Sequence, residues 1–216
     1  MKIVAMVPAR FGSQRLSQKN LLEINGKTIV GMSAEKCVLS GLFEEVYLNS
    51  ESDLILSKAP NGCKKYKRQQ FLADNNATSD DFIRDFLRNI SCDYLIQVHS
   101  IAPLVTVDQI SSFVSGFVNS GKQVGLTCEK LVLETVGSLG DPVNFTFKEK
   151  TNSQDLEHLR MINWCITGWR VDDQLLKEKC LSFGSSRFYY ELPRTSSIVI
   201  KNKEDYELCK KILEKQ

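Results

Sequence analysis

The sequence predicts an α/β fold with a mostly parallel central sheet and helices on both of its faces. Short apolar runs alternate with amphipathic helical segments through the first half of the chain, which is typical of parallel sheets covered by helices. The apolar runs do not alternate with polar residues, as expected for strands buried on both sides. The 216 residues suit a single domain over 1–216 with a sizeable core.

The first half of the chain supplies four predicted strands and three predicted helices. The strands are residues 3–7, 46–48, 94–98 and 123–127, and the helices are residues 28–40, 77–90 and 107–119. Gly41 ends the first helix, and Thr78 or Ser79 caps the second. Asp80 and Asp81 suit the positive end of that second helix.

The pattern loosens between residues 131 and 160, where turn residues and charges dominate. Val143, Phe145 and Phe147 alternate with polar residues, and this alternation predicts a hairpin-like strand. We interpret 131–160 as an arm within the single domain. Residues 196–216 then predict a strand followed by an amphipathic helix.

Composition excludes several classes of protein. The 28 basic and 26 acidic side chains leave a net charge of +2, so no strong field for nucleic acid is present. Seven scattered cysteines lack zinc-type spacing and indicate reduced thiols. No run approaches the ~20 apolar residues of a membrane span, and Arg10 closes a first run that is too short for a signal peptide. We therefore expect a cytoplasmic protein without membrane or nucleic-acid partners.

The stretch VPARFGSQRLSQKN, residues 7–20, follows the first predicted strand. Ligands of such sheets bind at the carboxyl ends of the strands. Arg10, Arg15 and Lys19 supply positive charge, and Gly12 lets a ligand approach the backbone closely. The stretch matches neither a Walker A loop nor a dinucleotide fingerprint. It predicts a phosphate cradle, and on charge alone a solvated basic loop is the alternative.

The same stretch resembles the opening motif of the acylneuraminate cytidylyltransferase family, the CMP-sialic acid synthetases and their relatives. Three later segments resemble that family in the right order: RQQFLADNNATSDD at 68–81, LIQVHSIAPLVTVDQI at 95–110 and LRMINWCITGW at 159–169. The resemblance covers nearly the whole chain and is weakest at 129–160.

This resemblance implies a nucleotidyltransferase with a glycosyltransferase-A-like fold. Such enzymes transfer CMP from CTP to an acidic, sialic-acid-like sugar and release pyrophosphate, a step in cell-surface polysaccharide biosynthesis. The family usually works as a homodimer, with the arm of one subunit near the active site of the other. The matching dimerisation arm here is 131–160.

The resemblance also implies the site residues. Arg10 and Lys19 would be catalytic, because they would hold the triphosphate. The nucleotide-binding residues would be Arg10, Gly12, Ser13, Arg15, Lys19, Asn20, Arg68 and Ser79, and the substrate-binding residues would be Gln97, His99, Arg160 and Asn163. A structural role at the end of its strand is the alternative for His99.

One departure concerns Mg²⁺, which the family binds through the aspartates of an S-I-D-I-D-T motif. Val199 and Lys201 occupy those two positions here, so the metal site is unknown. Lys201 could act as a fixed cation, or Asp74, Asp80 or Asp141 could hold the metal. Catalysis could also be lost, which would leave a nucleotide- or sugar-binding homologue or a partner subunit. Another acceptor, such as Kdo or a phosphonate, is a further alternative.

Overall fold

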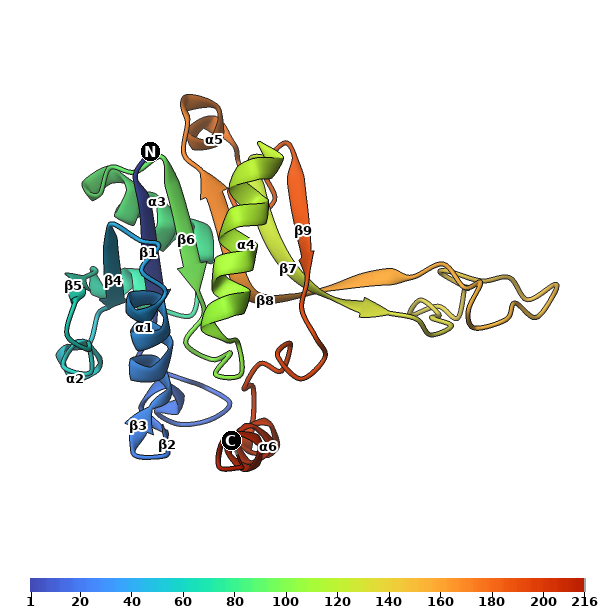
Figure 1. The fold of residues 1–216 in the computed structure, drawn as a ribbon, viewed down its shortest axis with the longest axis horizontal. Coiled ribbons are helices and arrows are strands. Elements are labelled where there is room, and N and C mark those ends of the chain that lie inside the picture. The colour runs from blue at the N-terminus through green and yellow to red at the C-terminus, as the bar shows by residue number, and fades with distance from the viewer. Residues whose placement is uncertain (216) are drawn as a thin grey trace.

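A seven-stranded mixed sheet runs through the protein in the order β5-β4-β1-β6-β8-β7-β9 in the computed structural model, which describes residues 1–215 (Figure 1). Four of the six pairings in this sheet are parallel, and β8 is antiparallel to both of its neighbours. The strands are β1 (Ile3–Pro8), β4 (Glu45–Ser50), β5 (Cys63–Lys67), β6 (Tyr94–Val98), β7 (Val124–Leu131), β8 (Leu159–Arg170) and β9 (Arg187–Glu191). The mostly parallel α/β sheet is confirmed.

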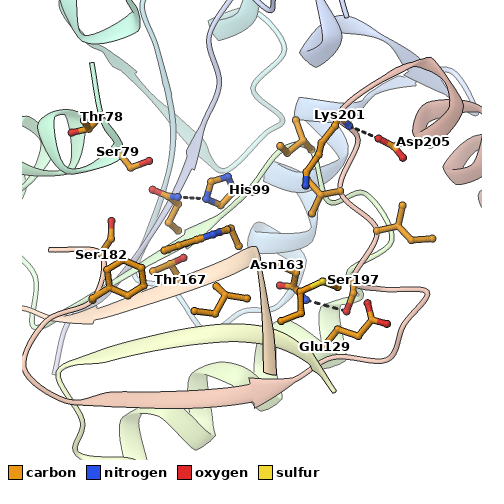
Figure 2. A pocket seen from close by; sticks show the side chains of 18 of the residues that line it. Thr78, Ser79, His99, Glu129, Asn163, Thr167, Ser182, Ser197, Lys201 and Asp205 are labelled. Carbon is orange, nitrogen blue, oxygen red and sulfur yellow. Dashed lines mark hydrogen bonds between the residues drawn. The ribbon is translucent and has the colours of Figure 1, made fainter. Parts of the chain in front are cut away.

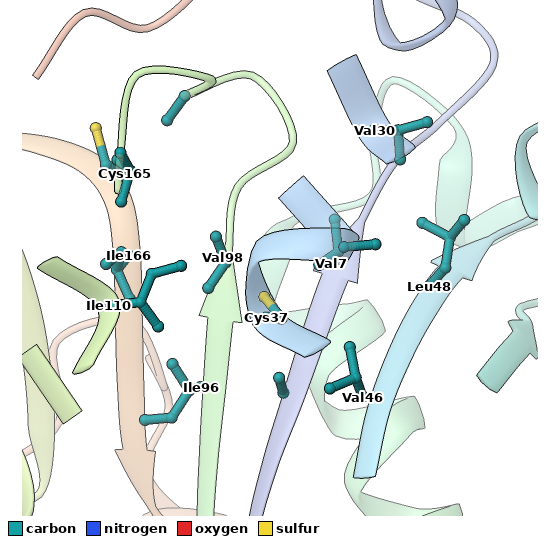
Figure 3. Packing of buried hydrophobic residues seen from close by; sticks show 14 of the residues in the cluster. Val7, Val30, Cys37, Val46, Leu48, Ile96, Val98, Ile110, Cys165 and Ile166 are labelled. Carbon is teal, nitrogen blue, oxygen red and sulfur yellow. The ribbon is translucent and has the colours of Figure 1, made fainter. Parts of the chain in front are cut away.

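Helices cover both faces of the sheet, as predicted. On one face, α1 (Ile29–Leu39), α2 (Asp53–Leu56) and α4 (Val107–Ser120) pack on the apolar side chains of β1, β4 and β6 (Figure 3). On the other face lie α3 (Ser79–Asn89) and α5 (Asp173–Lys177). The β2–β3 hairpin (Glu23–Ile24 and Lys27–Thr28) and α6 (Lys203–Leu213) form a third apolar cluster beside them. Two short 3-10 helices, Lys19–Leu21 and Gln70–Ala73, complete the described elements.

Side-chain caps define where the helices begin. The Thr78 hydroxyl accepts a hydrogen bond from the Asp81 N–H, and the Asp81 carboxylate accepts one from the Thr78 N–H in return. Of the two predicted caps, Thr78 is therefore the one that the structure shows. Such reciprocal bonds satisfy backbone donors that have no partner within the helix. They place the first turn of α3, with Ser79, beside the carboxyl edge of the sheet.

The strands predicted at 143–147 and at the start of 196–216 are wrong. Residues 143–147 form bends and a turn, and the Phe145 and Phe147 rings contact each other edge to face with centroids 5.3 Å apart. Residues 196–201 run as an irregular segment whose Ile200 N–H donates to the Ile101 carbonyl at 2.8 Å. A strand needs a neighbouring strand to take its backbone groups, and among residues 1–215 neither segment forms a ladder with one: Val143 makes a single backbone bond to Thr135 at 2.8 Å, and Ser197 is bound to β8 only through the Asn163 side chain.

Beyond the body of the sheet, β7 and β8 continue as a two-stranded ribbon that leads into the projecting arm (Figure 1). The arm exposes large apolar side chains, including Leu139 at 91% and Phe147 at 71% of their full areas. No helix within residues 1–215 is long and apolar enough to cross a membrane.

The close contact of β8 with α4 generates a stability prediction. A Cβ atom at Gly168 would lie 2.6 Å from Cε1 of Phe117, so Gly168→Ala must displace a buried ring. We expect the free energy of unfolding to fall by about 1–3 kcal/mol, measured by urea denaturation. Gly137→Ala is the control, because its nearest neighbour would be an ordinary 3.7 Å away. Equal losses in both variants would contradict this packing.

Candidate active site

Two adjoining hollows open at the carboxyl edge of β1 and β6. The larger has a volume of about 1310 Å³ and is lined by α3, β6, β8 and the segment 194–201 (Figure 2). The smaller has a volume of about 330 Å³ and is lined by the loop after β1. Arg15, Lys19, Ser79 and His99 line both hollows. The structure thus brings predicted residues from three distant segments to one place.

A buried ion pair clamps the start of the basic loop. An Arg68 guanidinium nitrogen lies 3.2 Å from a Glu51 carboxylate oxygen, and both side chains are buried. The other Glu51 oxygen accepts the Phe11 N–H at 2.7 Å, and Arg68 donates to the Ala9 carbonyl at 3.2 Å. Arg68 lines the smaller hollow, but its charge is already paired with Glu51.

Asn20 holds the far end of the same loop. Its amide donates to the Arg10 carbonyl at 2.9 Å, and its Oδ1 accepts the Ser100 hydroxyl at 2.7 Å. Between these two anchors the backbone stays open, since a Cβ atom at Gly12 would meet nothing within 4 Å. Ser13 lines the smaller hollow. The backbone of the loop is therefore accessible to a ligand.

Three cations face this opening. Arg10 donates to the Asn75 side chain at 3.2 Å, and the Lys19 ammonium donates to the Ile200 carbonyl at 2.9 Å. Arg15 is exposed and takes part in none of the ion pairs found within residues 1–215. Burial lowers the pKa of Lys19, and the neighbouring Arg15 and Arg10 charges lower it further. An anion in the hollow would relieve this repulsion.

Gln97 and Thr167 supply buried polar atoms at the base of the larger hollow. They are opposite each other on β6 and β8 and are exposed by only 2% and 1%. Within the described chain, Gln97 Oε1 and Thr167 Oγ1 have no hydrogen-bond partner. Gln97 Nε2 contacts the His99 ring. Burial, and then the Lys19 charge, lower the pKa of His99 to about 4, so this ring is neutral at pH 7.

The wall formed by β8 has both a polar and an apolar part. Asn163 donates to the Ser197 hydroxyl at 3.0 Å and accepts from the Thr127 hydroxyl at 2.7 Å (Figure 2). It therefore ties the segment 194–201 to the sheet. Trp164 takes a left-handed φ of 60° and packs edge to face on Phe183, with ring centroids 5.6 Å apart.

Two predicted residues, Gly12 and Arg160, line neither hollow, and the structure adds lining residues that were not predicted. Arg160 lies at the base of the arm, where it contacts Glu191 at 3.3 Å and the Tyr189 ring, and it lines neither hollow. The sequence reasoning missed Thr167 and Trp164 as lining residues. The antiparallel pairing of β8 with β6 places Thr167 opposite Gln97, and Trp164 lies on the same strand beyond the pairing. The local sequence carries no signal for that pairing.

Val199 and Lys201 both line the larger hollow. A hydrocarbon side chain cannot coordinate a metal, and an ammonium group repels a divalent cation, whereas Mg²⁺ prefers carboxylate oxygen. Within residues 1–215, no group of three or more His, Cys, Asp or Glu side chains is placed to hold a metal ion. The residues at this position do not fit a carboxylate-bound Mg²⁺ ion.

The alternative acids do not supply such a site either. The Asp80 carboxylate accepts from the Leu181 N–H at 2.6 Å and from the Ser182 hydroxyl at 2.6 Å. Asp74 lines only the smaller hollow, and Asp141 lies on the arm and lines neither. The three acids are thus in three different settings and do not converge.

Comparison with known proteins gives a family and several distant relatives. A family model described as Cytidylyltransferase matches residues 4–166. A 3-deoxy-manno-octulosonate cytidylyltransferase from Christiangramia forsetii is 26% identical over 144 residues, which cover 66% of this chain and 57% of that protein. A pseudaminic acid cytidylyltransferase from Campylobacter jejuni is 29% identical over 127 residues, which cover 56% and 55%.

An N-acylneuraminate cytidylyltransferase from Streptococcus agalactiae is 26% identical over 228 residues, which cover 95% of this chain and 52% of that protein. The chain spans about half the length of these curated relatives. Their names assign three different acidic sugars to similar sequences.

Solved structures match the whole fold. The CMP:2-keto-3-deoxy-manno-octonic acid synthetase complexed with CTP has a TM-score of 0.69 at 16% identity and covers 100% of this chain and 99% of its own. The 4-diphosphocytidyl-2C-methyl-D-erythritol synthase from Anaerococcus prevotii has a TM-score of 0.67 at 12% identity, with coverage of 99% and 96%. The nucleotidyltransferase fold is confirmed.

The buried clamp generates a prediction that has a matched control. Glu51→Ala leaves the buried Arg68 charge without its partner and frees the Phe11 N–H. We expect the free energy of unfolding to fall by about 3–5 kcal/mol, measured by urea denaturation. Lys67→Ala breaks the exposed Lys67–Asp53 pair and should cost about 0–1 kcal/mol. Similar losses in the two variants would show that the clamp does not organise the loop.

Proposed function

Because the chain belongs to the cytidylyltransferase family, we propose that it transfers CMP from CTP to a hydroxyl group of an acidic sugar and releases pyrophosphate. One observation carries this proposal. The basic loop lines one hollow, Gln97 and Thr167 with their buried unpartnered atoms line the other, and the two hollows share Lys19 and His99. The cations of the basic loop, which would hold a triphosphate, thus adjoin an uncharged polar floor of Gln97, His99 and Thr167, where an acceptor would bind.

The reaction places simple demands on the residues. The acceptor oxygen forms a bond to the α-phosphorus, and the bond from that phosphorus to the bridging oxygen breaks. Pyrophosphate leaves with the electron pair, and the hydroxyl proton passes to water. Arg10, Arg15 and Lys19 hold the triphosphate and stabilise the charge that builds up on the leaving group.

The remaining site residues divide between the two ends. The open backbone at Gly12 and Ser13 would bind phosphate oxygens, and Ser79 would contact the nucleotide from the first turn of α3. Asn20 and Arg68 act through the loop that they anchor. At the other end, Gln97 and His99 would bind the sugar, with Asn163 holding the wall of the hollow.

A sialic-acid-like sugar is the proposed acceptor. The N-acylneuraminate relative aligns over 95% of this chain, whereas the relatives named for Kdo and pseudaminic acid align over 66% and 56%. All seven cysteines are free, which suits a reducing compartment, so we place the reaction in the cytoplasm.

A second candidate function follows from Val199 and Lys201. Without the carboxylates that would hold Mg²⁺, the chain could bind CTP or the sugar without turning them over. Such a binding homologue or partner subunit would keep the basic loop and would lack pyrophosphate release.

The test of the proposed function is pyrophosphate release from CTP across a panel of acceptors. The panel contains N-acetylneuraminate, pseudaminic acid, Kdo and a phosphonate, each with and without Mg²⁺. We expect release with N-acetylneuraminate. Pyrophosphate release with Kdo alone or with the phosphonate alone would show that the acceptor is that compound and not a sialic-acid-like sugar. CTP binding without release from any acceptor would replace the proposed function with the second candidate.

The basic loop can be tested by calorimetric titration with CTP. Arg15→Ala and Lys19→Ala each remove a charge from the phosphate end, and we expect each to weaken CTP binding by about 1–3 kcal/mol. Lys122→Ala removes an exposed charge that lines neither hollow and should leave binding unchanged. Unchanged CTP affinity in both loop variants would show that the loop is not the cradle.

A homodimer is the proposed assembly, built partly on 131–160. The exposed Leu139 and Phe147 side chains would be covered by a second subunit. Arg160 lines neither hollow of its own subunit, so it would reach an acceptor only in a hollow of the second subunit. We expect a dimer by sedimentation at tens of micromolar and a monomer when Leu139→Glu and Phe147→Glu are combined. Leu39→Glu, which changes an apolar side chain on α1 that is exposed by 68%, should remain dimeric. A monomeric wild-type chain would contradict this assembly.

A further inference from the structure

Three of the four carboxylates that line the larger hollow accept hydrogen bonds, and the fourth, Glu129, lies 3.7 Å from the Arg194 guanidinium. One Asp205 oxygen accepts the backbone N–H groups of Lys201 and Asn202 at 2.8 and 3.1 Å. Asp81 accepts from Thr78, and Asp80 accepts from residues 181 and 182. These bonds hold the walls of the hollow together, so recruiting these acids to a metal would break its frame.

Lys201 is held at the position where the family has an aspartate. Its N–H is bound by Asp205, and the preceding Ile200 donates to Ile101 and accepts from the Lys19 ammonium at 2.9 Å. The Lys201 side chain projects from this segment into the hollow, on the side where His99 lies (Figure 2). Lys19 and Lys201 therefore meet on one wall, although they come from opposite ends of the chain.

At this wall, the Lys201 side chain can supply the positive charge that a metal ion would otherwise bring. Two aspartates that hold a divalent ion contribute no net formal charge, whereas Val199 and Lys201 contribute one positive charge. Arg10, Arg15, Lys19 and Lys201 together carry four positive charges, which match the roughly four negative charges of a nucleoside triphosphate. The triphosphate would thus meet a field at least as positive as that of a metal held by carboxylates.

We infer that Lys201, together with Lys19, directly neutralises the β- and γ-phosphates of the nucleotide, so that CTP binds without a divalent metal. This inference rests on the nucleotide-binding part of the proposed function. It assigns to Lys201 a contact with phosphate and to Asp205 the positioning of the Lys201 backbone. It also makes a nucleoside triphosphate a better ligand than a monophosphate, because the two lysines face the terminal phosphates.

The test is calorimetric titration of the full chain with CTP and with CMP in EDTA. Lys201→Ala should weaken CTP binding about tenfold or more and leave CMP binding unchanged, since CMP lacks the terminal phosphates. Lys201→Arg retains the charge and should retain most of the affinity. Lys203→Ala is the matched control, because it removes an exposed lysine two residues away that lines neither hollow.

A second arm compares the same titrations with and without Mg²⁺. Wild-type CTP affinity should not rise when Mg²⁺ is added. Combining Val199→Asp with Lys201→Asp should abolish metal-free CTP binding and make binding depend on Mg²⁺. Wild-type affinity that rises tenfold with Mg²⁺, or a Lys201→Ala variant that binds CTP as the wild type does in EDTA, would overturn the inference and leave the proposed function standing. A wild-type chain that binds no CTP in either buffer would overturn both.

Discussion

The buried Glu51–Arg68 ion pair is the interaction on which the site depends. A charge inside a protein is tolerated only when a partner and further hydrogen bonds satisfy it, and here the additional bonds go to the backbone at Ala9 and Phe11. These hydrogen bonds offset part of the free-energy cost of burying the pair. They also fix the point where the chain leaves β1. Burial lowers the pKa of Arg68, and Glu51 opposes that shift. The exposed basic residues that follow can therefore repel one another without displacing the loop.

The opposite wall is assembled from chain segments that are far apart in sequence. Asn163 binds Ser197, Lys19 binds the Ile200 carbonyl, and Ile200 binds Ile101. These single bonds replace the regular pairing of a strand, so the segment 194–201 can present Lys201 to the hollow while Ile200 and Cys209 stay in the third apolar cluster. The C-terminal helix α6 is thus part of the frame of the site.

The electrostatics of the two hollows differ in a way that matches a transfer reaction. Several cations lie close together at the basic loop. Burial, and then repulsion by Arg15 and Arg10, lower the pKa of Lys19. The floor of the larger hollow between β6 and β8 carries no charge, because His99 is neutral and Gln97 and Thr167 are amide and hydroxyl groups, whereas charged side chains such as Lys201 and Asp205 lie on its walls. In the proposed reaction the triphosphate would bind at the basic loop, and the acceptor hydroxyl would meet the uncharged floor.

Local sequence signals, namely buried apolar runs and side-chain caps, were enough to predict the α/β class, the first strand with the basic loop after it, and the elements α1, β4, α3, β6, α4 and β7. They did not predict α2 (Asp53–Leu56) or β5 (Cys63–Lys67), whose segment is mostly polar. The sequence also located the change at Val199 and Lys201. Contacts between distant parts of the chain were needed to show that Arg68 is paired with Glu51, that Arg160 and Gly12 line neither hollow, and that Thr167 and Trp164 line one of them. The tertiary structure also showed 143–147 and 196–201 to be irregular. Pairing partners across the sheet, and the partner of a buried charge, are long-range choices, and alternation within one segment carries no information about them.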